Sequence, residues 1–121
     1  PQAAMTSLAK SWTDADRRLV FGNSENREKF RRNLIEAFCQ PKGLADDIQL
    51  LAKPWGFCVK EASCAEVGFW AGCCDELVPP HHSRWMHQQV RGSRLVVDPC
   101  TSHVTTVHQY AGEYLAFAAG R

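Results

Sequence analysis

Two short apolar runs, each closed by a turn and followed by a helical stretch, constrain the fold of this chain more than any other feature. The first run is Val67–Trp70, closed at Gly72, and a helix is predicted over about residues 81–90. The second run is Leu95–Val97, which also ends in a turn. The order strand, helix, strand, helix predicts two parallel strands joined by a right-handed crossover, with the helices covering the sheet.

The last helix carries the strongest periodic signal. Its apolar and aromatic side chains recur at i, i+3, i+4, i+7, i+8 and i+11, namely Val107, Tyr110, Ala111, Tyr114, Leu115 and Ala118. Such a stripe predicts one buried helix face. Because two parallel strands make an unusually small sheet, residues 54–121 are expected to be the end of a larger unit.

Residues 1–53 have a different character, with helical periodicity and no strand pattern. One apolar stripe consists of Phe30, Leu34, Ile35 and Phe38. A second consists of Leu44, Ile48 and Leu51, in a short helix expected to end by Pro54. The fold class predicted is therefore α/β, with a small all-helical segment before a β-α-β-α unit.

Composition narrows the class of function. The chain has 121 residues, of which 45% are hydrophobic and 22% charged, and this is ordinary for one globular domain. Fourteen basic and 13 acidic residues give a net charge of +1, which does not indicate a nucleic-acid-binding face. No apolar run approaches the length of a membrane span, and no signal-peptide pattern is present. A cytoplasmic protein that binds neither nucleic acid nor membrane is expected.

Six cysteines stand at irregular spacings, at positions 39, 58, 64, 73, 74 and 100. In a chain without a signal segment, most of them are expected to be free thiols in a reducing compartment. The alternative for Cys39, Cys58 and Cys64 is that they are small buried hydrophobic side chains.

Each predicted strand is followed by a loop with a side chain capable of acid–base chemistry. Asp75 follows the first strand and His103 follows the second. Ligand chemistry collects at the carboxyl ends of parallel strands, and a carboxylate beside an imidazole can orient a general base. Taken singly, Asp75 could be a turn-capping aspartate and His103 a surface histidine. Together, at the ends of successive strands, they indicate an acid–base pair.

This arrangement resembles the C-terminal part of the α/β-hydrolase family. In that family the penultimate strand ends in a G-x-x-D-x-x-V-P stretch, which is matched by Gly72, Asp75, Val78 and Pro79. The family's last strand is followed by a histidine-bearing loop and a closing helix, and His103 with residues 106–118 corresponds to these.

The resemblance also implies a division of the chain and a chemistry. Residues 1–53 resemble the end of the family's helical cap, and residues 54–121 resemble the C-terminal part of its core. Asp75 then matches the acid of a serine-hydrolase catalytic triad, and His103 matches its base. The substrate class implied is an ester or similar acyl compound, hydrolysed without a cofactor or a metal ion.

The family's nucleophile motif, G-x-S-x-G, does not occur in these residues. The nearest string, Gly22–Asn26, lacks the second glycine and follows no strand. The loop before His103 also differs, because it reads Cys100-Thr101-Ser102 where the family usually has glycines. The nucleophile is therefore expected upstream of this chain, and the chain alone is expected to be inactive.

Three alternatives remain open at the level of sequence. The first is a zinc site formed by Cys73, Cys74, His81 and His82, although adjacent ligands diverge and C-x₂-C spacing is absent. The second is a cysteine nucleophile, Cys100 or Cys73, acting with His103. The third is a catalytically silent module that binds a second copy or a complementing chain through its unpaired sheet edge.

Overall fold

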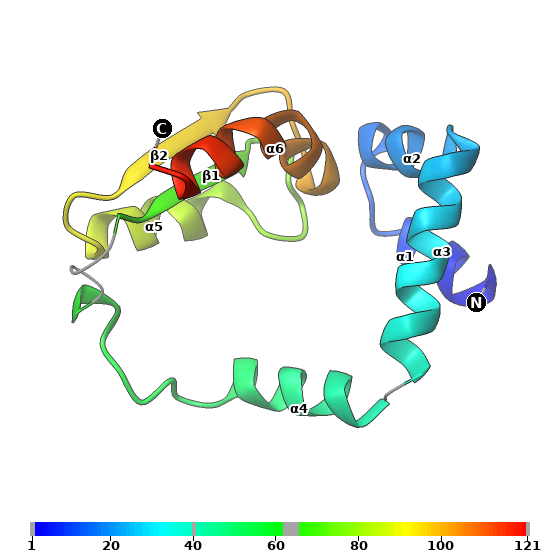
Figure 1. Ribbon diagram of the computed structural model, residues 1–121, viewed down its shortest axis with the longest axis horizontal. Coiled ribbons are helices and arrows are strands. Elements are labelled where there is room, and N and C mark those ends of the chain that lie inside the picture. The colour runs from blue at the N-terminus through cyan, green and yellow to red at the C-terminus, as the bar shows by residue number, and fades with distance from the viewer. Residues whose placement is uncertain (1, 40, 62–65, 121) are drawn as a thin grey trace.

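The structure is a computed structural model that describes residues 2–39, 41–61 and 66–120 (Figure 1). Within these residues the chain is a mixed α/β structure, with six α-helices and a two-stranded parallel sheet. The elements in order are α1 (Gln2–Ala9), α2 (Asp14–Phe21), α3 (Ser24–Cys39), α4 (Pro41–Ala52), a 3₁₀ turn (Val59–Glu61), β1 (Gly68–Gly72), α5 (Pro80–Gln89), β2 (Arg94–Asp98) and α6 (His103–Ala118).

The two strands pair as the sequence predicts. They run parallel, with Gly68 opposite Arg94 and Gly72 opposite Asp98, so both strands end at the same edge of the sheet. Helix α6 lies over one face of the strand pair, and α5 packs against the strands from the other side (Figure 1). The loops that follow β1 and β2 are therefore neighbours in space.

A glycine at the end of β1 lets these two loops meet. A Cβ atom on Gly72 would overlap the backbone carbonyl of Thr101 and would lie 2.6 Å from Thr106 Oγ1. Directly after it, the N–H of Cys73 donates to the carbonyl of Asp98 at 2.8 Å, and the N–H of Cys74 donates to that of Thr101 at 3.0 Å. The loop after β1 is thus bound to the loop after β2 by its backbone.

The N-terminal region is helical, and it contains one helix that periodicity did not predict. Helix α1 carries no clean apolar stripe, yet its Met5 is 1% exposed. Helices α2 and α3 meet around an aromatic cluster in which the ring of Trp12 lies 5.8 Å from Phe21 and 5.1 Å from Phe30, between centroids. Packing against α3, rather than its own pattern, therefore accounts for this first helix.

Helix α6 differs from its prediction in two ways. It begins at His103, so the histidine belongs to the first turn of a helix and not to a loop before residue 106. Its predicted apolar stripe is also divided. Tyr114 and Phe117 pack edge-on against the Trp70 ring, at centroid distances of 4.8 and 5.4 Å. Val107 and Leu115, in contrast, are 57% and 72% exposed.

The apolar face of α4 is likewise uncovered. The helix spans the predicted positions, but Leu44, Ile48 and Leu51 are all exposed, and so are Trp55 and Phe57 just beyond it. Helix α4 contacts α3 and lies apart from the strands (Figure 1). The predicted helix is therefore confirmed, and its apolar face is exposed.

The accessible surface is large for the size of the chain. It amounts to 8695 Å², whereas a compact monomer of 13.6 kDa exposes about 6,600 Å². The fully buried hydrophobic side chains are correspondingly few among the described residues, namely Met5, Val20, Ala71 and Val90. An excess of about 2,000 Å² is more than the roughly 800 Å² that each partner contributes to a standard protein interface.

The cysteines agree with one expectation and disagree with another. Those at 39, 58, 73, 74 and 100 are free thiols, and all are exposed. Cys39 and Cys58 are therefore not the buried hydrophobic side chains of the alternative interpretation, and Cys64 lies outside the described residues.

None of the described helices combines the length and the apolar character needed to cross a bilayer.

Candidate active site

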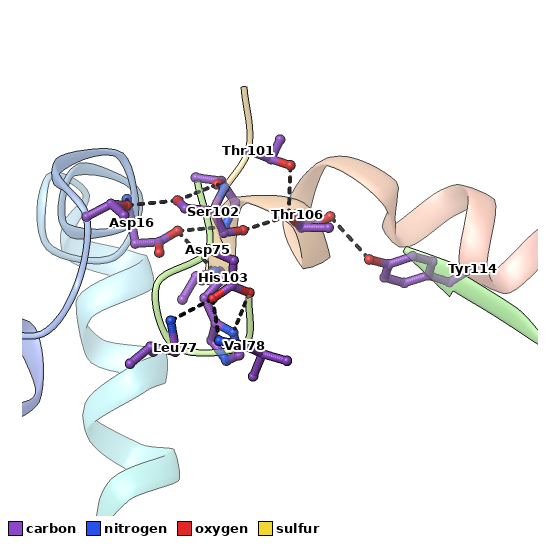
Figure 2. A network of polar contacts seen from close by, with 12 residues as sticks. Asp16, Asp75, Leu77, Val78, Thr101, Ser102, His103, Thr106 and Tyr114 are labelled. Carbon is purple, nitrogen blue, oxygen red and sulfur yellow. Dashed lines mark hydrogen bonds and ion pairs between the residues drawn. The ribbon is translucent and has the colours of Figure 1, made fainter. Parts of the chain in front are cut away.

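The loop between β1 and α5 holds Asp75 with both of its carboxylate oxygens engaged. Oδ1 accepts hydrogen bonds from the backbone N–H groups of Leu77 and Val78, at 2.9 and 2.8 Å, so the side chain caps its own turn. Oδ2 lies 3.0 Å from Nδ1 of His103 (Figure 2). Asp75 thus caps its own turn through one oxygen and contacts the His103 ring through the other.

The backbone around His103 is fixed by hydrogen bonds at the start of α6. Ser102 precedes the helix, and its N–H donates to Thr105 Oγ1 at 2.8 Å. The Thr106 hydroxyl lies 2.6 Å from the carbonyl oxygen of Ser102 and 2.8 Å from Thr101 Oγ1. Because Thr101, Ser102 and Thr106 are buried, these hydrogen bonds fix the turn from which the His103 ring projects.

The geometry of the pair assigns a role to each ring nitrogen. A carboxylate only accepts hydrogen bonds, so the proton of a neutral His103 resides on Nδ1, and Nε2 is the nitrogen left for proton transfer. The Asp75 side chain is 9% exposed and that of His103 is 43% exposed. Asp75 is therefore shielded from solvent, while the His103 ring reaches the surface, where a general base could meet a substrate.

A second carboxylate, Asp98 at the end of β2, supports the loop that leads to His103. Its Oδ1 accepts from the N–H groups of Cys100 and Thr101, at 2.7 and 3.0 Å. Its Oδ2 accepts from the Tyr110 hydroxyl at 2.6 Å. Chiefly through the Tyr110 bond, the pKa of Asp98 is held below its ordinary value of 3.8, and the same bond raises the pKa of Tyr110 above 10.0.

These two shifts predict a pH window for the contribution of this bond to stability. A lowered carboxylate pKa contributes stability above the unfolded value and loses it as the pH falls through the folded one. A raised tyrosine pKa contributes stability below the unfolded value and loses it as the pH rises through the folded one. The difference in unfolding free energy between the wild type and Tyr110→Phe should thus be constant between about pH 5 and 9 and shrink on both sides.

Urea denaturation of both proteins from pH 2.5 to 11 measures this difference. Phenylalanine keeps the ring and removes the hydroxyl donor, so ring packing contributes equally to the stability of both proteins. A difference that stays the same below pH 3 would show that the Asp98 carboxylate is not the acceptor in solution.

Asp75 and His103 border a pocket of about 150 Å³. Trp70, Ser83 and Tyr114 are among its other lining residues. The pKa of Tyr114 is raised, mainly because burial disfavours its ionised form. Sites for small organic ligands usually span about 300–1,000 Å³, so this pocket is smaller than a complete substrate site.

The other residues that the sequence singled out are not brought together. His81 and His82 stack edge-to-face at 4.3 Å between ring centroids, exposed on the first turn of α5. In the described part of the chain, no group of three or more His, Cys, Asp or Glu side chains could hold a metal ion. Cys74 Sγ lies 3.6 Å from the carbonyl oxygen of Pro99, and among these residues no hydrogen bond joins His103 to Cys73 or Cys100.

Two residues of the site region were not predicted. Asp16, 1% exposed in α2, accepts hydrogen bonds from the first turn of α6, and Ser83 lines the pocket beside His103. In the sequence Asp16 belongs to the capped start of its own helix, and no local pattern points to a partner 88 residues away. The sequence pattern of α5 points to its apolar residues and does not single out Ser83.

Comparisons with models of protein families, with curated proteins and with solved structures find no match to this chain.

Proposed function

We propose that this chain carries the acid and the base of a serine hydrolase of the α/β-hydrolase type, and that the nucleophilic serine belongs to polypeptide outside these 121 residues. The observation that carries the proposal is the 3.0 Å contact between Asp75 Oδ2 and His103 Nδ1. The two side chains follow adjacent parallel strands, where such pairs serve catalysis.

The proposed reaction is acyl transfer to water. A serine hydroxyl attacks the carbonyl carbon of an ester while Nε2 of His103 takes its proton, and the imidazolium then gives that proton to the departing alkoxide. Water next attacks the acyl-serine, with Nε2 again taking and returning a proton. Asp75 keeps the ring oriented through Nδ1 and stabilises the charged imidazolium without itself becoming protonated.

In this proposal residues 54–121 are the C-terminal part of the hydrolase core, and residues 1–53 are the end of its helical cap. The β-α-β-α order, the parallel register and the position of Asp75 after Gly72 support the assignment. No cofactor or metal ion is required, because the chemistry uses protein groups alone.

Four features support completion of the site by further polypeptide. The G-x-S-x-G motif is absent from the sequence, and the pocket beside His103 is smaller than a substrate site. Among the described residues β1 pairs with β2 alone, and the buried indole N–H of Trp70, on β1, has no hydrogen-bond acceptor. A neighbouring strand or loop against β1 would supply what is lacking.

The exposed apolar surface favours a second candidate function, that of a catalytically silent association module. Large side chains such as Leu51, Phe57 and Leu115 are 62–75% exposed, and the accessible surface exceeds that of a compact monomer by about 2,000 Å². A homodimer would cover part of this surface and leave His103 without a serine.

The native mass of the purified, reduced protein separates the two functions. We expect sedimentation at micromolar concentration to show no stable monomer of 13.6 kDa. A heteromer whose second chain bears a G-x-S-x-G elbow would support the hydrolase, and a homodimer with no such chain would support the association module. A cooperatively folded monomer would contradict both.

A further inference from the structure

A buried carboxylate from the N-terminal helices caps the helix that begins with His103. Asp16 belongs to α2, and its Oδ1 accepts hydrogen bonds from the N–H groups of Val104 and Thr105, at 3.0 and 2.9 Å (Figure 2). The side chain is 1% exposed. These two N–H groups belong to the first turn of α6, which has no carbonyl partners for them within the helix.

A second contact, from the residue before α2, binds the residue that precedes His103. The hydroxyl of Thr13, the residue before α2, donates to Ser102 Oγ at 2.8 Å. The residues immediately before and after His103 are therefore both bound by one short segment, residues 13–16. His103 itself is bound through its ring to Asp75.

The burial of Asp16 makes this contact more than a surface cap. A carboxylate removed from water needs hydrogen-bond donors or positive charge, and here it has two backbone donors together with the positive end of the α6 dipole. The nearby aspartate of the same helix, Asp14, is exposed and pairs with Arg17. The two aspartates thus share a helix and differ in whether they touch α6.

We propose that Asp16 is a positioning residue for His103, through which the N-terminal helices keep the imidazole in register with Asp75. The first turn of α6 sets the backbone from which the ring extends, and Asp16 is the side chain from a distant segment that accepts two of its N–H groups, alongside the local cap at Ser102. The catalytic meaning of the assignment rests on the proposed function, whereas the structural link between Asp16 and the ring does not.

The experiment is ¹⁵N NMR of the His103 ring in the full reduced chain, together with amide hydrogen exchange at Val104 and Thr105. In the wild type we expect the neutral ring to carry its proton on Nδ1. In Asp16→Ala both amides should exchange about tenfold faster or more, and a second tautomer should appear. A role for Asp16 in stability alone would speed exchange and leave the tautomer of the folded protein unchanged.

Two further variants sharpen the comparison. Asp16→Asn keeps an acceptor oxygen in place and is as good a helix cap, so it should retain the wild-type tautomer. Asp14→Ala removes an exposed carboxylate from the same helix and should change neither readout. An unchanged tautomer in folded Asp16→Ala would overturn the inference.

If Asp16→Ala does not fold, denaturant titration of the wild type tests the inference instead. As denaturant is raised in small steps, loss of the Nδ1–H tautomer should coincide with loss of protection at Val104 and Thr105. A tautomer that persists after both amides exchange freely would overturn the inference. Neither the tautomer nor the amide exchange rate depends on turnover. Failure of the proposed function would show as an absence of esterase activity in the completed enzyme, and it is therefore distinguishable from failure of this inference.

Discussion

Replacement of His103 by alanine should lower kcat for hydrolysis of a p-nitrophenyl ester by at least about 10⁴-fold in the completed enzyme. Without the imidazole, no group takes the proton of the attacking serine or returns it to the leaving alkoxide. Asp75→Asn should cost about 10⁴-fold, because an amide next to Nδ1 favours the wrong tautomer of the ring. The isolated 121-residue chain should show no turnover above the buffer rate.

The assay needs the chain joined to, or mixed with, polypeptide that supplies the G-x-S-x-G elbow. His108→Ala and Glu76→Gln are matched controls, since His108 is exposed on the same helix as His103 and Glu76 is the exposed neighbour of Asp75. Both controls should keep the wild-type rate. A completed enzyme that retained full activity with His103 replaced would rule out the assigned base.

Substitution of Gly72 by valine should destabilise the fold by about 3 kcal/mol, at the upper end of the cost of overpacking. The new Cβ would overlap the Thr101 carbonyl, which is backbone and cannot move aside without moving the loop. That loop joins β2 to α6, so the contact between Asp75 and His103 should weaken as well. Urea denaturation measures the first effect, and the ¹⁵N spectrum of the His103 ring measures the second.

Gly112→Ala is the control for Gly72→Val. Gly112 lies inside α6, and a Cβ there meets no atom within 4 Å. Alanine should therefore stabilise the protein by about 1 kcal/mol, through helix propensity alone. Equal destabilisation by both substitutions would mean that the overlap with the Thr101 carbonyl is not the cause of the effect at Gly72.

The sequence was sufficient to single out Asp75 and His103 as two side chains that would meet. Asp75 and His103 each follow a short apolar run, and parallel strands place such positions at one edge of a sheet. This works because strand pattern, turn residues and crossover handedness are local or nearly universal constraints. The same local reading placed His103 in a loop, although Ser102 directly before it is a favoured N-cap residue and forms a capping box with Thr105.

The helix faces show where periodicity stops being informative. The stripe on α6 contains Tyr114, which packs on Trp70, and Leu115, which is 72% exposed. Both residues belong to one apolar stripe, and only the packing of α6 against the strands decides which of them is covered. Helix α4 formed where its pattern predicts it, yet no described element covers Ile48 or Leu51.

By itself, the sequence determined the order of the elements from β1 to α6, the parallel pairing and the two side chains proposed for catalysis. Those features depend on short-range patterns that any packing must satisfy. Only the tertiary structure decided that Asp75 Oδ2 meets His103 Nδ1 at 3.0 Å and that Asp16 caps the first turn of α6. Contacts across 28 and 88 residues depend on how the elements pack, and no pattern of neighbouring residues records it.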